Sequence, residues 1–154
     1  MKSETMPYEK ISTRIKEALA IITQLGYKSK CISPVEFLEY LTGETPADDT
    51  MTLNEILSND FLMIHEVIEI SELKKKGIPV NKHTCLNYPR AVYEAHLTAT
   101  KFELTHALNK KDSEWLKLRM RHIQQWLNDE NMPKDLAHRC RSMATKVAKL
   151  AKNL

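Results

Sequence analysis

The chain has 154 residues, a length that suits one domain covering residues 1–154, because autonomous domains cluster near roughly 100 to 150 residues. With only three Gly and six Pro among abundant helix-forming residues, the composition predicts an all-α fold. A formal net charge of +3 is too small to imply a polyanionic partner by itself, and no stretch approaches the roughly 20 apolar residues that span a bilayer.

The N-terminal and cysteine patterns indicate the compartment. The first ten residues, MKSETMPYEK, contain no apolar signal segment. Cys31, Cys85 and Cys140 are single and widely separated, and an odd number without a CxxC pair argues against a disulfide framework. We therefore expect a cytoplasmic protein with reduced thiols and no membrane association.

Three helices are predicted in the first third of the chain. Apolar residues recur with a 3.6-residue period up to Leu25, and Gly26 ends that helix. Capping boxes, in which Ser or Thr is followed three residues later by Glu, begin the other two after Ser33 and Thr52. The predicted helices are 8–25, 34–41 and 52–57, and the polar stretch 44–50 is predicted to be a surface loop.

Two longer helices, 60–76 and 89–109, are predicted to be central. Gly77 and Pro79 end the first, and Pro89 begins the second after a loop over residues 81–88. Helices near 113–128 and 133–151 follow. Five of these are long or medium helices and one or two are short, and the prediction is a compact all-α helical bundle of about five or six helices.

The segment 60–76 differs from an ordinary surface helix. Its apolar side chains are spread around the whole circumference at roughly 100° per residue, which is typical of a buried helix. His65, Glu69 and Glu72 lie at positions i, i+4 and i+7 and form one polar line along it.

The segment 89–109 has a solvent side and an apolar side. Glu94 and Lys101 belong to a polar arc of roughly 80°. His96 and Glu103, seven residues apart, point into the middle of the apolar side, and His106 lies at its flank. Ionisable groups are therefore expected on the buried faces of both central helices.

Buried carboxylates must be paired, hydrogen-bonded, protonated or bound to metal, since burying one alone costs several kcal/mol or more. If the two faces meet, His65, Glu69, His96 and Glu103 provide nitrogen and oxygen ligands that suit Zn, Mn, Fe or Ni. We predict a metal-dependent hydrolase with these four as ligands, in which Glu69 is a ligand or general base. His106 would orient a ligand or donate a proton.

Residues near the loop between the central helices are candidates to bind a small anionic substrate. They are Lys82, His83 and Arg90.

Two short motifs resemble known families. Glu103-Leu-Thr-His106 resembles the Glu-x-x-His motif of ferritin-like di-iron carboxylate bundles, which implies metal ligands on adjacent turns of one helix. This chain has no second Glu-x-x-His, which that family requires. Glu66-x-x-Glu69 resembles the Glu-x-x-Glu of MazG-like nucleotide pyrophosphohydrolases, which implies Mg²⁺ held against a triphosphate, but the later Glu-x-x-Asp is absent.

Other enzyme motifs are absent from the sequence. It has no HExxH of zincins, no phosphate-binding GxxxxGK[ST] or GxGxxG loop and no GxSxG nucleophile elbow. Kinases, ATPases, Rossmann enzymes and α/β-hydrolases are thereby set aside.

The sequence leaves a non-enzymatic alternative open. In it, the His and Glu residues form a structural hydrogen-bond and ion-pair network. The chain would then bind nucleic acid or a protein partner through its basic C-terminal helices, since residues 110–154 carry 11 Lys and Arg against 5 Asp and Glu. Helices this short also allow a second copy to complete the bundle, so a homodimer is a further expectation.

Overall fold

The computed structural model describes residues 7–43 and 52–154 and confirms the all-α prediction. These residues form eight helices, so the predicted number of five or six was too low. The predicted loop at 44–50 lies outside the described residues. No described helix combines the length and apolarity needed to cross a membrane.

The two central helices are among the longest, and the others pack around them. In chain order the helices are α1 (Tyr8–Gln24), α2 (Pro34–Leu41), α3 (Leu53–Leu57), α4 (Asp60–Lys75), α5 (Thr84–Asn87), α6 (Pro89–Asn109), α7 (Ser113–Leu127) and α8 (Lys134–Ala151).

The short helix α5 lies where a loop was predicted. One helical turn is too short to produce a hydrophobic period, so the sequence pattern gives no signal for it. Tertiary and local hydrogen bonds hold it instead. The buried Thr84 hydroxyl donates to the Pro79 carbonyl at 2.7 Å and accepts from the Asn81 amide at 2.8 Å.

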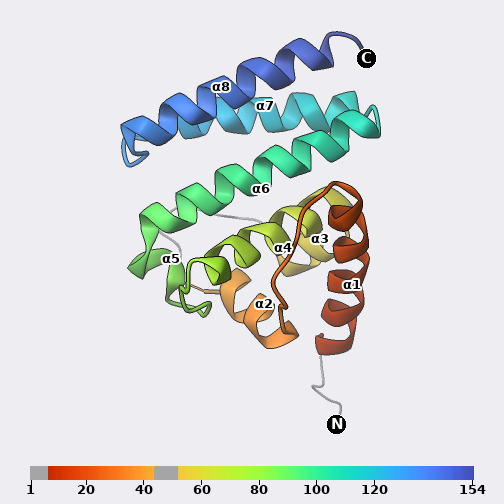
Figure 1. Cartoon of the computed structure of the whole chain (residues 1–154), viewed down its shortest axis with the longest axis vertical. Coiled ribbons are helices and arrows are strands. Elements are labelled where there is room, and N and C mark those ends of the chain that lie inside the picture. The colour runs from red at the N-terminus through yellow and green to blue at the C-terminus, as the bar shows by residue number, and fades with distance from the viewer. Residues whose placement is uncertain (1–6, 44–51) are drawn as a thin grey trace.

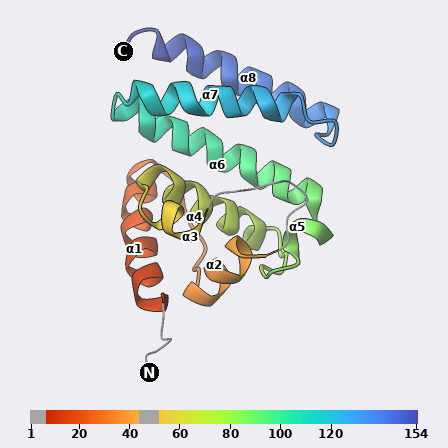
Figure 2. The ribbon, with the colours of Figure 1, turned by 180° about the vertical axis from the view of Figure 1, so that it is seen from behind.

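The helix α6 runs across the middle of the molecule and separates two groups of helices. Figure 1 shows α7 and α8 together on one side of α6 and α1 to α4 on the other, and the reverse view in Figure 2 agrees. Each group has its own apolar core, one centred on α1, α2 and α4 and the other on α6, α7 and α8. Any cluster that joins α4, α6 and α7 therefore lies between the two cores.

The helix α4 is buried on all sides, as its circumferential apolar pattern predicted. Ten of its sixteen residues are buried. Its N-terminus is capped by the Asn59 side chain, which accepts from the Leu62 amide at 3.0 Å. Lys74 and Lys75 occupy its last turn, where cations complement the helix dipole. Polar groups on this helix are consequently held inside the protein at fixed positions.

Small residues let α6 approach α4 closely. Ala95 and Ala99 belong to the core that contains α4, and both are buried. They lie on the same helix as His96 and Glu103, so the depth of this packing sets how near those side chains come to α4.

We expect Ala99→Leu to destabilise the protein by about 1–3 kcal/mol, because three added heavy atoms must be fitted into a filled core. Urea denaturation measures the free energy of unfolding. The matched control is Lys101→Leu, an exposed position on the same helix, which should change it by at most about 0.5 kcal/mol. Equal effects from the two variants would contradict tight packing of α6 on α4.

Candidate metal centre

Three donor atoms from α4 and α6 converge at one point. His65 and Glu69 are one turn apart on α4, and His96 faces them from α6. The distances from His65 Nε2 to Glu69 Oε1, from His65 Nε2 to His96 Nδ1 and from His96 Nδ1 to Glu69 Oε1 are each 3.1 Å. These atoms form an equilateral triangle, which we call the triad.

The size of the triangle matches the spacing of neighbouring ligands on one metal ion. Bonds of about 2.1 Å at right angles separate two donor atoms by about 3.0 Å, whereas tetrahedral angles separate them by about 3.4 Å. The observed edges of 3.1 Å lie between these two values. Two His and one carboxylate would hold an ion and leave further coordination positions for water or substrate.

A hydrogen bond donated to Glu103 sets the proton position on His65. His65 Nδ1 lies 2.8 Å from Glu103 Oε1. An ionised carboxylate only accepts, so His65 Nδ1 carries the proton and Nε2 is left to face the triad. Burial opposes the charged imidazolium, but hydrogen bonds to Glu103 and Glu69 raise the pKa of His65 to about 10. Without a metal ion, a proton on Nε2 thus provides the positive charge among the three donor atoms.

Glu103 is completely buried and accepts hydrogen bonds from two further side chains, both on α7. The Trp115 indole Nε1 donates to its Oε2 at 2.7 Å, and Arg119 donates from a terminal nitrogen to its Oε1 at 3.0 Å. Arg119 Nε also lies 2.7 Å from Oε2. Burial would raise the pKa of Glu103, but His65 and Arg119 outweigh burial and lower it. Glu103 therefore supports His65 from behind and is not itself one of the three converging ligands.

Tyr40 of α2 holds the second oxygen of Glu69. Its hydroxyl is buried and donates to Glu69 Oε2, while Glu69 Oε1 points to the triad. Burial would raise the pKa of Glu69, but hydrogen bonds from His65 and His96 hold it well below its ordinary range. With one oxygen occupied by Tyr40, this carboxylate is arranged to act as a monodentate ligand.

His96 is the most accessible member of the triad. Its side chain is 27% exposed, compared with 2% for His65 and 8% for Glu69. The Trp126 ring of α7 packs edge-on against the His96 ring, with centroids 4.4 Å apart. Burial, together with the nearby charge of His65, lowers the pKa of His96. Exchange of an ion with solvent would thus proceed past His96 and Trp126.

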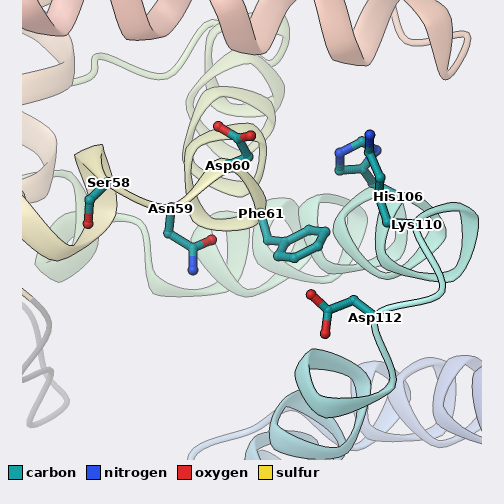
Figure 3. A pocket seen from close by; sticks show the side chains of 7 residues that line it. All are labelled: Ser58, Asn59, Asp60, Phe61, His106, Lys110 and Asp112. Atoms are coloured by element: carbon teal, nitrogen blue, oxygen red, sulfur yellow. The ribbon is translucent and has the colours of Figure 1, made fainter.

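The structure brings His65, Glu69, His96 and Glu103 into one hydrogen-bonded network, with Glu103 one step removed from the triad. His106 lies elsewhere, and its ring packs edge-on against Phe61. Figure 3 shows these two rings in a surface pocket also lined by residues of the α4 N-terminus and of the α6–α7 connection. The lining residues are Ser58, Asn59, Asp60, Phe61, His106, Lys110 and Asp112.

Other predicted residues have separate partners. Glu72 accepts from the Tyr27 hydroxyl at 2.6 Å and takes no part in the triad. Arg90, considered for an anionic substrate, pairs with Asp135 at 2.6 Å.

The sequence reasoning gave Tyr40, Trp115, Arg119 and Trp126 no role in the metal site. Tyr40 has no local signal, because its distance to Glu69 along the chain is 29 residues and only the tertiary fold brings them together. Arg119 did carry a signal, since in the sequence it lies between two Trp residues of the predicted helix 113–128. A buried carboxylate elsewhere would be its natural partner.

Comparisons with known proteins assign no family. No family model, no curated protein and no solved structure matches the chain significantly.

We expect Glu103→Gln to lower the free energy of unfolding by about 3–5 kcal/mol, because it leaves the buried Arg119 without a counter-charge. The matched control is Glu94→Gln on the same helix, where the carboxylate makes surface ion pairs with Lys76 and Arg90. The Glu94→Gln substitution should lower the free energy of unfolding by about 0–1 kcal/mol. Chemical denaturation measures both, and a small loss in Glu103→Gln would show that the buried pair is not required for folding.

Proposed function

We propose that the protein binds one divalent transition-metal ion at the triad and is a metal-dependent hydrolase. The observation that carries the proposal is the triangle of His65 Nε2, Glu69 Oε1 and His96 Nδ1 with 3.1 Å edges. A metal ion among these atoms would replace the proton that His65 Nε2 carries in its absence. Fe, Mn, Ni and Zn ions all accept such a set of two imidazole nitrogens and one carboxylate oxygen.

The surroundings of the triad match what metal sites require. A ligating histidine ordinarily donates its other N–H to a carboxylate, which fixes the ring and its tautomer. Glu103 is placed to do this for His65, and Tyr40 restrains Glu69. Both oxygens of Glu69 are engaged, which favours a ligand role over that of a general base.

The proposed chemistry uses the positions that three protein ligands leave open. An ion held there would lower the pKa of a coordinated water to about 7 and would thus supply a nucleophile at neutral pH. His65, Glu69 and His96 would hold the ion, and the chemistry it would supply is hydrolysis of an ester, amide or phosphoester. His106 is given no role, because its ring contacts Phe61 outside the triad.

The competing function is non-enzymatic. The network of Glu103 with His65, Trp115 and Arg119 ties α4, α6 and α7 together, and a structural role would account for it without a metal. A proton on His65 Nε2 would likewise bring Glu69 and His96 close without a metal. The metal-dependent function is preferred because two histidines and a carboxylate at mutual distances of 3.1 Å are a donor set that transition-metal ions bind, and His96 is partly exposed to solvent.

We expect tag-free protein, purified without chelator, to contain about one Fe, Mn, Ni or Zn ion per chain. His96→Ala should lower metal affinity by more than about 100-fold, since losing a ligand costs more than losing a supporting side chain. His96 is the best ligand to remove because it is partly exposed. Elemental analysis and anaerobic titration with Fe(II), Mn(II), Ni(II) and Zn(II) measure the effect.

The matched control is His106→Ala, which removes a histidine of the same helix outside the triad and should retain the metal. Equal metal loss in both variants, or no uptake by the parent protein, would overturn the metal site. If the loaded protein binds metal but hydrolyses no ester, amide or phosphoester in a substrate screen, the site stands and the hydrolase does not.

We expect Tyr40→Phe to weaken metal binding by about 10–100-fold, because Glu69 loses the hydroxyl that restrains it. The control is Tyr27→Phe, which removes the same kind of bond from Glu72 on the same helix. Both variants should lose about 1–3 kcal/mol of stability. Only Tyr40→Phe should also change metal affinity, so equal affinities in the two variants would contradict the role of Tyr40.

A further inference from the structure

The outer helix α8 carries an uninterrupted positive charge over most of its length. From Leu136 to the C-terminus the sequence has no Asp or Glu, but five Lys and Arg residues. The Arg139 side chain already has a hydrogen-bond partner, because it donates to the Thr98 hydroxyl of α6 at 2.9 Å. The other cations are exposed.

The exposed cations gather along one shallow groove. It is lined by His138, Arg141, Ser142, Thr145, Lys146 and Lys149, which recur every three or four residues and so share a face of α8. We call this surface the basic groove. Arg141, Lys146 and Lys149 form no ion pair with any residue in the described parts of the chain.

The position of α8 leaves this face accessible. Its apolar stripe, with Leu136, Cys140, Ala144 and Val147, is buried in the core of α6 to α8. Figures 1 and 2 both show α8 at the edge of the molecule, with α7 and α6 to one side of it only. The cations are therefore presented by a rigid, docked helix instead of a mobile tail.

We propose that the basic groove binds the phosphate backbone of a double-stranded nucleic acid. From His138 to Lys149 the groove extends about 16 Å at 1.5 Å per residue. Over that length each strand of a duplex presents about five phosphates, spaced at about 3.4 Å. Lys and Arg contacts to phosphates provide affinity without reading the base sequence. This inference is independent of the metal site.

The composition of α8 favours a duplex over two other polyanions. Single strands are bound by stacking bases on aromatic side chains, and α8 contains no Phe, Tyr or Trp. A membrane-surface helix inserts a free apolar face, whereas the apolar face of α8 is used in the core. The large exposed apolar side chains of this region, Leu150 and Leu154, lie at its end.

The test compares two triple variants that change the net charge equally. The groove variant reverses the charge of the basic groove and carries Arg141→Glu, Lys146→Glu and Lys149→Glu. The α1 variant reverses exposed charges on α1 and just after it and carries Lys10→Glu, Lys16→Glu and Lys28→Glu. Binding to a fluorescent 20-base-pair DNA duplex and to an RNA duplex is measured by anisotropy from 25 to about 200 mM salt. Circular dichroism checks that each variant is folded.

For the parent protein we expect a Kd of about 10⁻⁶ to 10⁻⁴ M. The affinity should fall as the salt concentration rises, with the slope expected for about three phosphate contacts. The groove variant should bind at least tenfold more weakly with a shallower salt dependence, and the α1 variant within about threefold of the parent. Equal losses in the two variants, or no binding by the parent, overturn the proposal. So does groove-dependent binding to phosphatidylserine vesicles without binding to either duplex.

Discussion

A carboxylate without access to water has to be neutralised within the protein. The packing of the central helices depends on the carboxylate of Glu103. It accepts hydrogen bonds from His65 of α4 and from Trp115 and Arg119 of α7. Glu103 of α6 thereby fixes α4 on one side of α6 and α7 on the other. Because an unpaired charge at this depth costs several kcal/mol, alternative arrangements of the three helices are disfavoured.

The same interaction orients the site. The hydrogen bond from His65 Nδ1 to Glu103 holds the imidazole ring so that His65 Nε2 faces Glu69 and His96. Ala99 allows the two backbones to come close enough for these side chains to meet. The metal site that we propose is thus built on two rigid helices instead of loops, which is the arrangement that keeps ligands within a few tenths of an ångström of productive positions.

The two proposed activities occupy different parts of the molecule. The triad lies between the two cores, where burial strengthens electrostatic interactions, and the basic groove lies on the solvent face of α8. Reversing charges at Arg141 leaves the triad intact, and removing His96 leaves the groove intact. Each can accordingly be tested without disturbing the other.

Local patterns in the sequence determined the described helices other than α5 and the residues that carry buried charge. The circumferential apolar pattern of 60–76 predicted a buried α4, and the seven-residue spacing of His96 and Glu103 placed both on the inner face of α6. Tertiary structure alone decided that His96 completes the triad while Glu103 supports it, that Tyr40 restrains Glu69 and that His106 lies apart. Helical periodicity fixes which face a side chain occupies, but the register between two packed helices depends on non-local contacts that no single segment encodes.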